Sequence, residues 1–461
     1  MYQDPAFSRS NPHVAIPSAT ATSMPPSIAP LRVGLLGLGT VGLGTYTVLR
    51  RNADLIAMRT GQAIEVVAVA VRNTARAQAL LAPEVTLLSD PFALVDLPEV
   101  DVVVEVLGGT TVAKDLVLRA IANGKHVVTA NKALLAEHGN ALFAAAQAQG
   151  VVLAYEGAVA VSIPIIKALR EGLSANRIEW LAGIINGTSN FILSAMRTQG
   201  VSFAQALADA QAQGFAEADP TLDVEGGDAA HKLALLASNA FGTPLQFAQV
   251  HTQGITQLTG EDIDYAARLG YQVKLLGIAK RNEQGLELRV QPCLLPQDHL
   301  LAQVHGSMNA VMVKSDAAGL TMYYGAGAGS EQTASAVIAD LVDLCRSARL
   351  PAPLRVPYLG IQASALKPLP VCNTGHAQSR FYVRFNIGAH TYSPTELLAQ
   401  CHAAGLPKVE LHSFSDKGEQ LAVVLLTQAL SPNALDAALA ALRQVGAVRG
   451  AVHTLRLETL Q

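Results

Sequence analysis

Charge, aromatic side chains, cysteine and long apolar runs are all scarce in this 461-residue chain, and each shortage argues against a class of protein. The 33 Lys and Arg nearly balance the 36 Asp and Glu, so the chain has no basic footprint for binding nucleic acid. The longest apolar runs, such as residues 100–107, have the length of a strand and include charged residues, far short of a membrane span. The four cysteines have no metal-ligand spacing, and a reducing cytoplasm suits them best. We therefore expect a cytoplasmic protein without nucleic-acid or membrane partners.

The chain is rich in apolar residues, which make up 50% of it, and in glycine, with 37 copies. This composition is typical of an α/β protein, and a chain of this length divides into about two to four domains. Residues 1–30, by contrast, are rich in Pro, Ser, Ala and Thr and contain no apolar segment for a secretory signal. We expect a disordered tail there.

A glycine-rich turn follows the first apolar strand. Residues 31–36 have the pattern of a buried strand, and a helical pattern runs from the turn through Leu49. Glycines at G-x-G-x-x-G spacing between a strand and a helix let the backbone approach a dinucleotide pyrophosphate at the helix N-terminus. The predicted cofactor-binding residues are Gly37, Leu38, Gly39, Thr40, Val41 and Gly42.

The second strand, residues 64–71, is followed by Arg72 rather than by an acidic residue. An acid at this position bonds the ribose hydroxyl of NAD, whereas an arginine pairs with the 2′-phosphate of NADP. The sequence therefore favours NADP over NAD. The alternative is a solvated arginine at the end of a strand.

Short apolar strands alternate with helices as far as residue 155, which predicts a parallel sheet of the Rossmann type. Lys132 directly follows one of these strands, at the end of the stretch 125–132. Because ligands bind at the carboxyl ends of such strands, Lys132 is a candidate for the cofactor or substrate crevice. The alternative is a surface lysine at a turn.

Two segments of small residues also follow strands. Residues 156–163 form a loop whose carbonyl groups would suit a hard monovalent cation. Residues 186–190 precede a helix predicted from Phe191, and the amides at a helix start receive an anion such as a carboxylate. A plain connection and a simple N-cap are the respective alternatives.

Residues 215–232 concentrate carboxylates beside a lysine in an otherwise apolar chain. The first half is punctuated by Pro and Gly, so its carboxylates, Glu217 and Asp223 among them, can converge on a ligand. Asp228 and Lys232 are i and i+4 in the helix predicted to follow, which places them on one face. The alternative is a solvated acidic loop followed by an ordinary surface ion pair.

The last third of the chain contains a glycine-rich run at residues 323–329, which reads as a lead into a long helix at 333–347. A proline-dense linker follows, and then the order strand, helix, strand, strand, helix, strand, which is a ferredoxin-like unit. The predicted divisions are a tail (1–30), a Rossmann domain (31–155), an α+β substrate and dimerisation domain (156–350), a linker (351–377) and a C-terminal module (378–461).

Taken together, these pieces resemble homoserine dehydrogenase along nearly the whole length past residue 30. The resemblance implies NAD(P)-dependent interconversion of L-homoserine and L-aspartate 4-semialdehyde, for threonine, methionine and isoleucine biosynthesis, in a homodimer or homotetramer. It also implies that the C-terminal module is similar to an ACT regulatory domain. The motifs that carry it are Gly37–Gly42, Ala130–Leu134, Asn186–Thr188, Glu217–Pro220, Asp223–Gly226, Asp228 with Lys232, and Gly327–Gly329.

The resemblance assigns roles to particular residues. It places Lys132 and Lys232 at the reacting centre, with Asp228 ordering the reacting oxygen or a water. A lysine whose pKa is lowered by burial and a cationic neighbour exchanges a proton near neutral pH. The same carry-over assigns the substrate to Glu217, Asp223, Gly187 and Thr188, the cofactor also to Lys132 and Gly329, and a monovalent cation such as sodium to Glu156, Val159, Val161 and Ile163. The chain departs from the family pattern at Val161-Ser162, Phe215, Ala326 and Gln332.

Two other interpretations account for parts of the chain. An oxidoreductase of the glucose–fructose oxidoreductase type shares the Rossmann half and a lysine like Lys132, but lacks the Asn186–Thr188 and Asp228/Lys232 motifs. A catalytically silent NADP-binding sensor with an ACT module is the second. Within the module, residues 386–394 contain no acid for an effector ammonium, and the glycine usual after the turn is missing, which predicts weak or absent inhibition by threonine.

Overall fold

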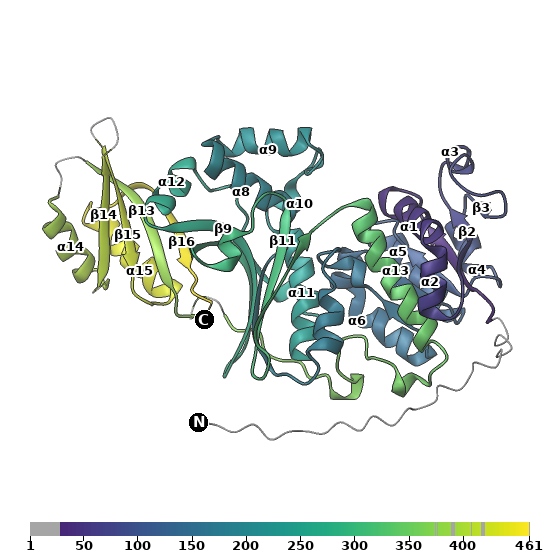
Figure 1. Cartoon of the computed structure of the whole chain (residues 1–461). Coiled ribbons are helices and arrows are strands. Elements are labelled where there is room, and N and C mark those ends of the chain that lie inside the picture. The colour runs from purple at the N-terminus through teal and green to yellow at the C-terminus, as the bar shows by residue number, and fades with distance from the viewer. Residues whose placement is uncertain are drawn as a thin grey trace, which may run out of the picture.

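The computed structural model describes residues 28–373, 375, 377–388, 392–406, 408–415 and 420–460, so most of the predicted tail lies outside the described part. In Figure 1 a nucleotide-binding half lies at the right, a second sheet in the middle and the C-terminal module at the left. Among the described residues, no helix combines the length and the apolarity that crossing a membrane requires.

The first half of the chain builds a six-stranded parallel sheet in the order β3-β2-β1-β4-β5-β6. This is the Rossmann strand order, and the direction of winding reverses between β1 and β4, where such sheets bind their ligands. The predicted Rossmann-type half of the α/β fold is therefore confirmed. The strands are β1 (Leu31–Leu36), β2 (Ile64–Ala70), β3 (Thr86–Leu88), β4 (Val102–Glu105), β5 (His126–Thr129) and β6 (Leu153–Ala154).

Helices cover both faces of this sheet because successive side chains of a strand point to opposite faces. Leu35 packs in the cluster that includes Leu341 of α13 (Ser330–Ser347), whereas Leu36 packs in the cluster that includes Leu116 of α5. Helix α13 thus returns from far along the chain to lie beside α1 (Figure 1). The other helices of this half are α1 (Thr40–Arg51), α2 (Ala53–Thr60), α3 (Thr74–Gln78), α4 (Pro91–Asp96), α5 (Thr111–Ala122) and α6 (Lys132–Gln149).

The second sheet has the order β12-β11-β7-β9-β10, and neighbouring strands are antiparallel. The glycine-rich run predicted to lead into the long helix begins inside a strand, since residues 323–326 belong to β12. Tyr324 there pairs with Ala310, so the glycine that follows does not interrupt the ladder. The strands are β7 (Ile178–Ile184), β8 (His251–Thr252), β9 (Tyr271–Asn282), β10 (Gly285–Pro296), β11 (Met308–Ser315) and β12 (Gly319–Ala326).

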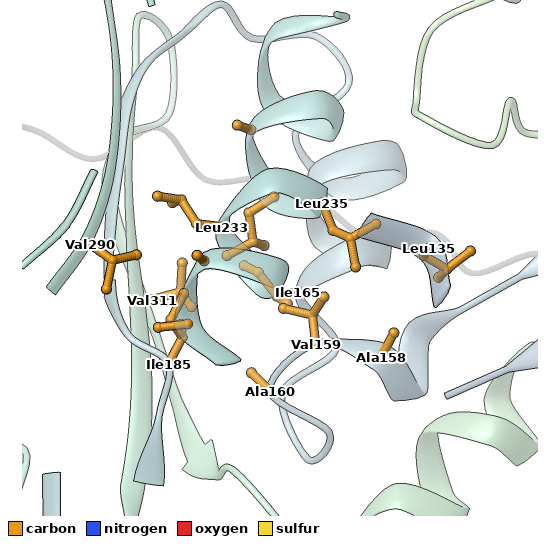
Figure 2. Packing of buried hydrophobic residues seen from close by; sticks show 14 of the residues in the cluster. Leu135, Ala158, Val159, Ala160, Ile165, Ile185, Leu233, Leu235, Val290 and Val311 are labelled. Atoms are coloured by element: carbon orange, nitrogen blue, oxygen red, sulfur yellow. The ribbon is translucent and has the colours of Figure 1, made fainter. Parts of the chain in front are cut away.

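Helix α11 (Gly227–Phe241) lies between the second sheet and the nucleotide-binding half (Figure 2). Leu233 is on the side of the strands that carry Val290 and Val311, and Leu235 is on the side of Leu135 of α6. Nearly all residues of α11 are buried, so the helix is enclosed on every side, and its polar residues need partners inside the protein. The remaining helices of this region are α7 (Ile165–Lys167), α8 (Gly187–Gln199), α9 (Phe203–Ala212), α10 (Thr221–Val224) and α12 (Gly260–Arg268).

The C-terminal module has the predicted strand, helix, strand, strand, helix, strand order, with its strands arranged β16-β13-β15-β14. Strand β16 also pairs with β10, at Cys293 and Leu294, so the module continues the second sheet. The elements are β13 (Arg380–Gly388), α14 (Pro394–Ala403), β14 (Val409–Ser415), β15 (Gln420–Thr427), α15 (Pro432–Gln444) and β16 (Arg449–Leu457).

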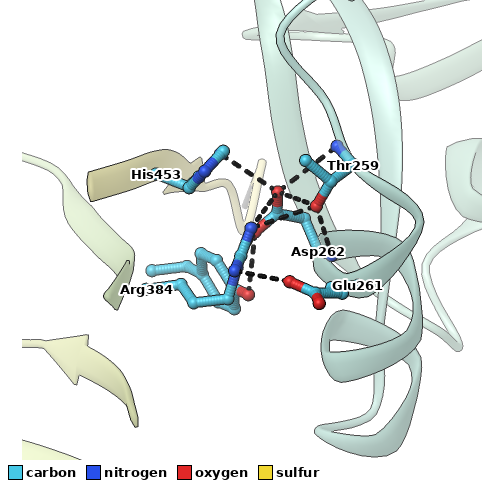
Figure 3. Close-up of polar contacts among 6 residues, drawn as sticks. Thr259, Glu261, Asp262, Arg384 and His453 are labelled. Atoms are coloured by element: carbon cyan, nitrogen blue, oxygen red, sulfur yellow. Dashed lines mark hydrogen bonds and ion pairs between the residues drawn. The ribbon is translucent and has the colours of Figure 1, made fainter. Parts of the chain in front are cut away.

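A buried ion pair fastens the module to α12 (Figure 3). The Arg384 guanidinium donates to both Asp262 oxygens, at 2.6 and 3.1 Å, and to Glu261 at 2.7 Å. His453 lies 3.3 Å from the same Asp262 carboxylate, and Thr259 begins α12 with a capping box. A buried charge needs a partner and hydrogen bonds, and Asp262 has both.

Candidate active site

The carboxylate of Asp228 is the centre of the candidate site. It belongs to the first turn of α11, which follows Gly226 at a φ of 85°. Lys232 donates to one carboxylate oxygen at 2.8 Å, and Lys132 lies 3.1 Å from the other. The i, i+4 pair expected from the sequence is therefore formed, and it is joined by the strand-end lysine of the other half of the molecule.

Asn186 is a member of this cluster that the sequence analysis assigned no role. Its Nδ2 donates to Asp223 at 2.6 Å and to Asp228 at 2.8 Å. Its Oδ1 accepts the Ser189 amide and caps α8, which begins at Gly187, four residues before the predicted start. An asparagine directly before a Gly-Thr pair was the available signal, since this residue type favours N-caps.

The charged groups of the cluster shift one another's pKa values. Burial opposes the ionisation of Asp228, but Lys232 and Lys132 outweigh it and hold the pKa of that carboxyl well below its usual range. Attraction to Asp228 raises the pKa of Lys132 above the ordinary lysine value, in spite of burial. The sequence-based expectation for Lys132 was the opposite and is wrong, because a carboxylate separates the two lysines. Burial raises the pKa of Asp223, against the hydrogen bond from Asn186.

The residues predicted to bind the substrate differ in their exposure and in their contacts with this cluster. Glu217 is exposed, yet its negative charge contributes to the raised pKa of Lys132. The Thr188 hydroxyl donates to the Phe215 carbonyl at 2.7 Å, which leaves the Thr188 amide as its group for a ligand. A Cβ at Gly187 would lie 2.7 Å from the Ser307 carbonyl oxygen, so no side chain fits at this helix start.

The glycine turn after β1 has the geometry of a dinucleotide cradle. Gly37 has a φ of 97°, and a Cβ at Gly42 would lie 2.1 Å from the Gly37 carbonyl oxygen. A Cβ at Gly39 would meet nothing within 4 Å, so space remains beside the N-terminus of α1. Gly329, at a φ of 136°, precedes α13, and the Ser330 hydroxyl there donates to the Thr40 carbonyl. The residues present thus fit a bound dinucleotide.

Arg72 follows the end of β2 and is exposed. Among the described residues it takes part in none of the side-chain hydrogen bonds or ion pairs, whereas the neighbouring Asn73 caps α3. Its guanidinium is therefore available to an anion at the edge of the cofactor crevice.

The loop predicted to hold a cation is closely packed. Its Glu156 carboxylate accepts the Ile166 and Lys167 amides, at 3.0 and 2.9 Å, so that side chain is occupied. The Val159 and Val161 carbonyls accept none of the backbone bonds found among the described residues, which leaves both free for a cation. The described residues contain no group of three or more His, Cys, Asp or Glu arranged around a metal ion, so any cation here would rely on carbonyl oxygens.

A Rossmann sheet with an open glycine cradle and a lysine–carboxylate cluster at its crevice defines an NAD(P)-dependent oxidoreductase. Residues 37–156 match the homoserine dehydrogenase NAD-binding domain, and residues 164–342 match the homoserine dehydrogenase family itself. The chain belongs to the homoserine dehydrogenase family.

Individual homoserine dehydrogenases are similar to this chain over nearly its full length. The chain is 51% identical to a homoserine dehydrogenase of Pseudomonas aeruginosa, over 94% of this chain and 99% of the relative. It is 45% identical to one from Neisseria gonorrhoeae, over 94% and 99%. The crystal structure of a homoserine dehydrogenase from Thiobacillus denitrificans, at 53% identity, superposes with a TM-score of 0.87 over 94% of this chain and 99% of that one. The glucose–fructose oxidoreductase alternative is therefore wrong, and a silent sensor has no support.

Proposed function

We propose that the Asp228 cluster catalyses the reversible, NADP-linked reduction of L-aspartate 4-semialdehyde to L-homoserine. The observation that carries this proposal is a single buried carboxylate that contacts two lysines, one from each side of the crevice. Such an arrangement fixes a proton donor beside the site of hydride transfer. When bound, the nicotinamide supplies the hydride.

The two lysines have different environments and so different roles. The Lys132 side chain is 34% exposed, whereas that of Lys232 is 9% exposed and also donates to the Ile185 carbonyl. Lys132, as an ammonium, gives a proton to the substrate oxygen as the aldehyde is reduced, and takes it back in the reverse direction. Lys232 holds the Asp228 carboxylate in place, and Asp228 orients the Lys132 ammonium.

The substrate is held by the groups around this centre. Its ammonium pairs with Glu217 and Asp223, and that added cation offsets the burial that raises the pKa of Asp223. Its carboxylate is received by the Gly187 and Thr188 amides at the N-terminus of α8, where the helix dipole favours an anion. A small amino acid offers only these two handles besides the reacting carbon.

Four finer assignments belong to the same proposal. NADP is preferred over NAD through Arg72, and the Val159 and Val161 carbonyls contribute to a monovalent-cation site. The enzyme acts as a homodimer or homotetramer in the cytoplasm, where its four cysteines remain free thiols. Residues 378–461 form an ACT-like module that serves assembly more than sensing; residues 389–391 of its effector turn lie outside the described part.

Oxidation of L-homoserine by the purified protein, followed by NADPH absorbance, tests the proposal. Lys132→Ala is expected to lower kcat by about 10²–10⁴, the usual scale of general acid–base help. Lys232→Ala is also expected to lower kcat, because Asp228 would lose the contact that holds it in place. An Asn239→Ala variant, which alters the far end of α11, serves as the control for damage to the helix. Absence of homoserine oxidation by the wild type would refute the function, and an unchanged kcat in either lysine variant would refute that residue's role.

A further inference from the structure

Asn309 stands out among the buried amides of the molecule. It lies in β11, is 0% exposed, and neither its Oδ1 nor its Nδ2 has a hydrogen-bond partner among the described residues. Buried polar side chains are normally hydrogen-bonded, so an amide without a partner calls for an explanation. The other buried asparagines of the described chain all make side-chain hydrogen bonds: Asn131, Asn186, Asn190 and Asn239.

The Asn309 amide is wedged between two segments of the candidate active site. A Cβ at Gly327 would lie 2.3 Å from its Cγ, Oδ1 and Nδ2, and a Cβ at Gly187 would lie 3.6 Å from its Oδ1. Gly187 starts α8, the proposed carboxylate site. Gly327 follows β12 and leads to Gly329, the proposed cofactor residue. The Asn309 side chain therefore lies against the Gly327 segment and close to the start of α8.

The segment after β12 also has unused hydrogen-bonding groups. The peptide groups of Gly327 and Ala328 take part in none of the hydrogen bonds found among the described residues. They lie directly against an amide that has both a donor and an acceptor free. The absence of a Cβ at Gly327 lets its backbone lie this close to the amide and gives the segment conformational freedom.

We propose that Asn309 is a positioning residue that fixes the Gly327–Ala328 peptides against the start of α8 when cofactor is bound. This inference rests on the proposed function, since it takes Gly187 as the substrate end and Gly329 as the cofactor end. Its consequence is energetic coupling: the cofactor orders the contact that Asn309 shares with the substrate segment, so each ligand tightens the other.

Binding of NADPH, measured by its fluorescence with and without L-homoserine, tests the coupling directly. The two ligands cannot react with each other because both are in the reduced form. In the wild type, saturating homoserine is expected to lower the Kd of NADPH by at least about 5-fold, the lower end of typical coupling. In Asn309→Ala the factor should fall below about 2-fold, and in Asn309→Asp, which keeps the shape and loses the donor, it should be intermediate.

A role in folding alone would give a different result. It would lower the thermal midpoint while leaving the coupling factor as it is in the wild type. Asn239→Ala is the matched control, because Asn239 is an amide only 5% exposed that bonds to Tyr155 away from the site. Should Asn309→Ala fail to fold, Asn309→Asp and Asn309→Ser provide the same measurement.

The outcomes separate this inference from the proposed function. If the wild type oxidises homoserine but shows no coupling, or if the coupling survives in the Asn309 variants, Asn309 has no positioning role and only the inference fails. If the wild type neither binds NADPH nor oxidises homoserine, the proposed function itself is refuted.

Discussion

Replacement of Asp228 by asparagine removes the charge that unites the candidate site and keeps its shape. At the 3.1 Å separation from Lys132, two unit charges attract by roughly 5 kcal/mol at an effective dielectric constant of about 20. Because a third of the Lys132 side chain is exposed, solvent screening reduces this to about 1 kcal/mol, the upper end for exposed pairs. Asp228→Asn therefore removes a substantial attraction without opening a cavity.

The sign of the pH effect follows from the direction of the shift. Attraction to Asp228 raises the pKa of Lys132, so the ammonium that donates the proton survives to higher pH. Reduction of the semialdehyde should lose rate as the pH rises through that raised pKa. In Asp228→Asn the pKa of Lys132 falls, and the loss of rate should begin at lower pH, on top of a drop in kcat of about 10²–10⁴ at neutral pH.

The assay is kcat/KM for L-aspartate 4-semialdehyde as a function of pH, followed by NADPH absorbance. Asp343→Asn is the matched control, because Asp343 pairs with Lys167 outside the crevice and its loss should leave the profile unmoved. The reasoning is refuted if the alkaline limb of Asp228→Asn coincides with that of the wild type, or moves to higher pH.

Three further predictions address the cofactor, the module and its effector. Arg72→Asp should raise KM for NADP much more than KM for NAD, and equal changes would show that Arg72 does not meet the 2′-phosphate. Arg384→Met should destabilise the protein to urea by about 3–5 kcal/mol, because Asp262 would keep a buried charge without its partner. Since the pKa of Asp262 is lowered in the folded protein, its contribution should be lost as the pH falls below about 4; a variant as stable as the wild type would contradict the role of this pair. Threonine titrated into the homoserine assay should inhibit weakly or not at all, and strong inhibition at sub-millimolar threonine would overturn that expectation.

The features that the sequence predicted well depend on short stretches of chain. The glycine turn at 37–42 and the Asp228–Lys232 pair lie within single elements, and periodicity alone placed both. The C-terminal order of strands and helices was predicted correctly, because each element has its own apolar period and turn residues.

The features that could not be predicted from the sequence depend on contacts between residues that are far apart in the chain. Asn186 bridges two carboxylates that lie 37 and 42 residues further along the chain, and no local pattern indicates that convergence. The direction of the Lys132 pKa shift has the same origin, since Asp228 reaches Lys132 only through the fold. Strand β12 was not predicted because glycines, which are depleted in strands, stand at and beyond its end, whereas pairing with β11 decides its conformation.

The pairing of β16 with β10 has a consequence for shortened forms of this protein. A chain that ended before residue 378 would leave the Cys293–Leu294 edge of β10 open and would deprive the buried Arg289 of Glu458. Open strand edges recruit strands from other molecules, and a buried arginine that has lost one of its partners favours local unfolding. A gene truncated at this boundary would therefore encode a polypeptide prone to self-association and local unfolding rather than a smaller enzyme of the same stability.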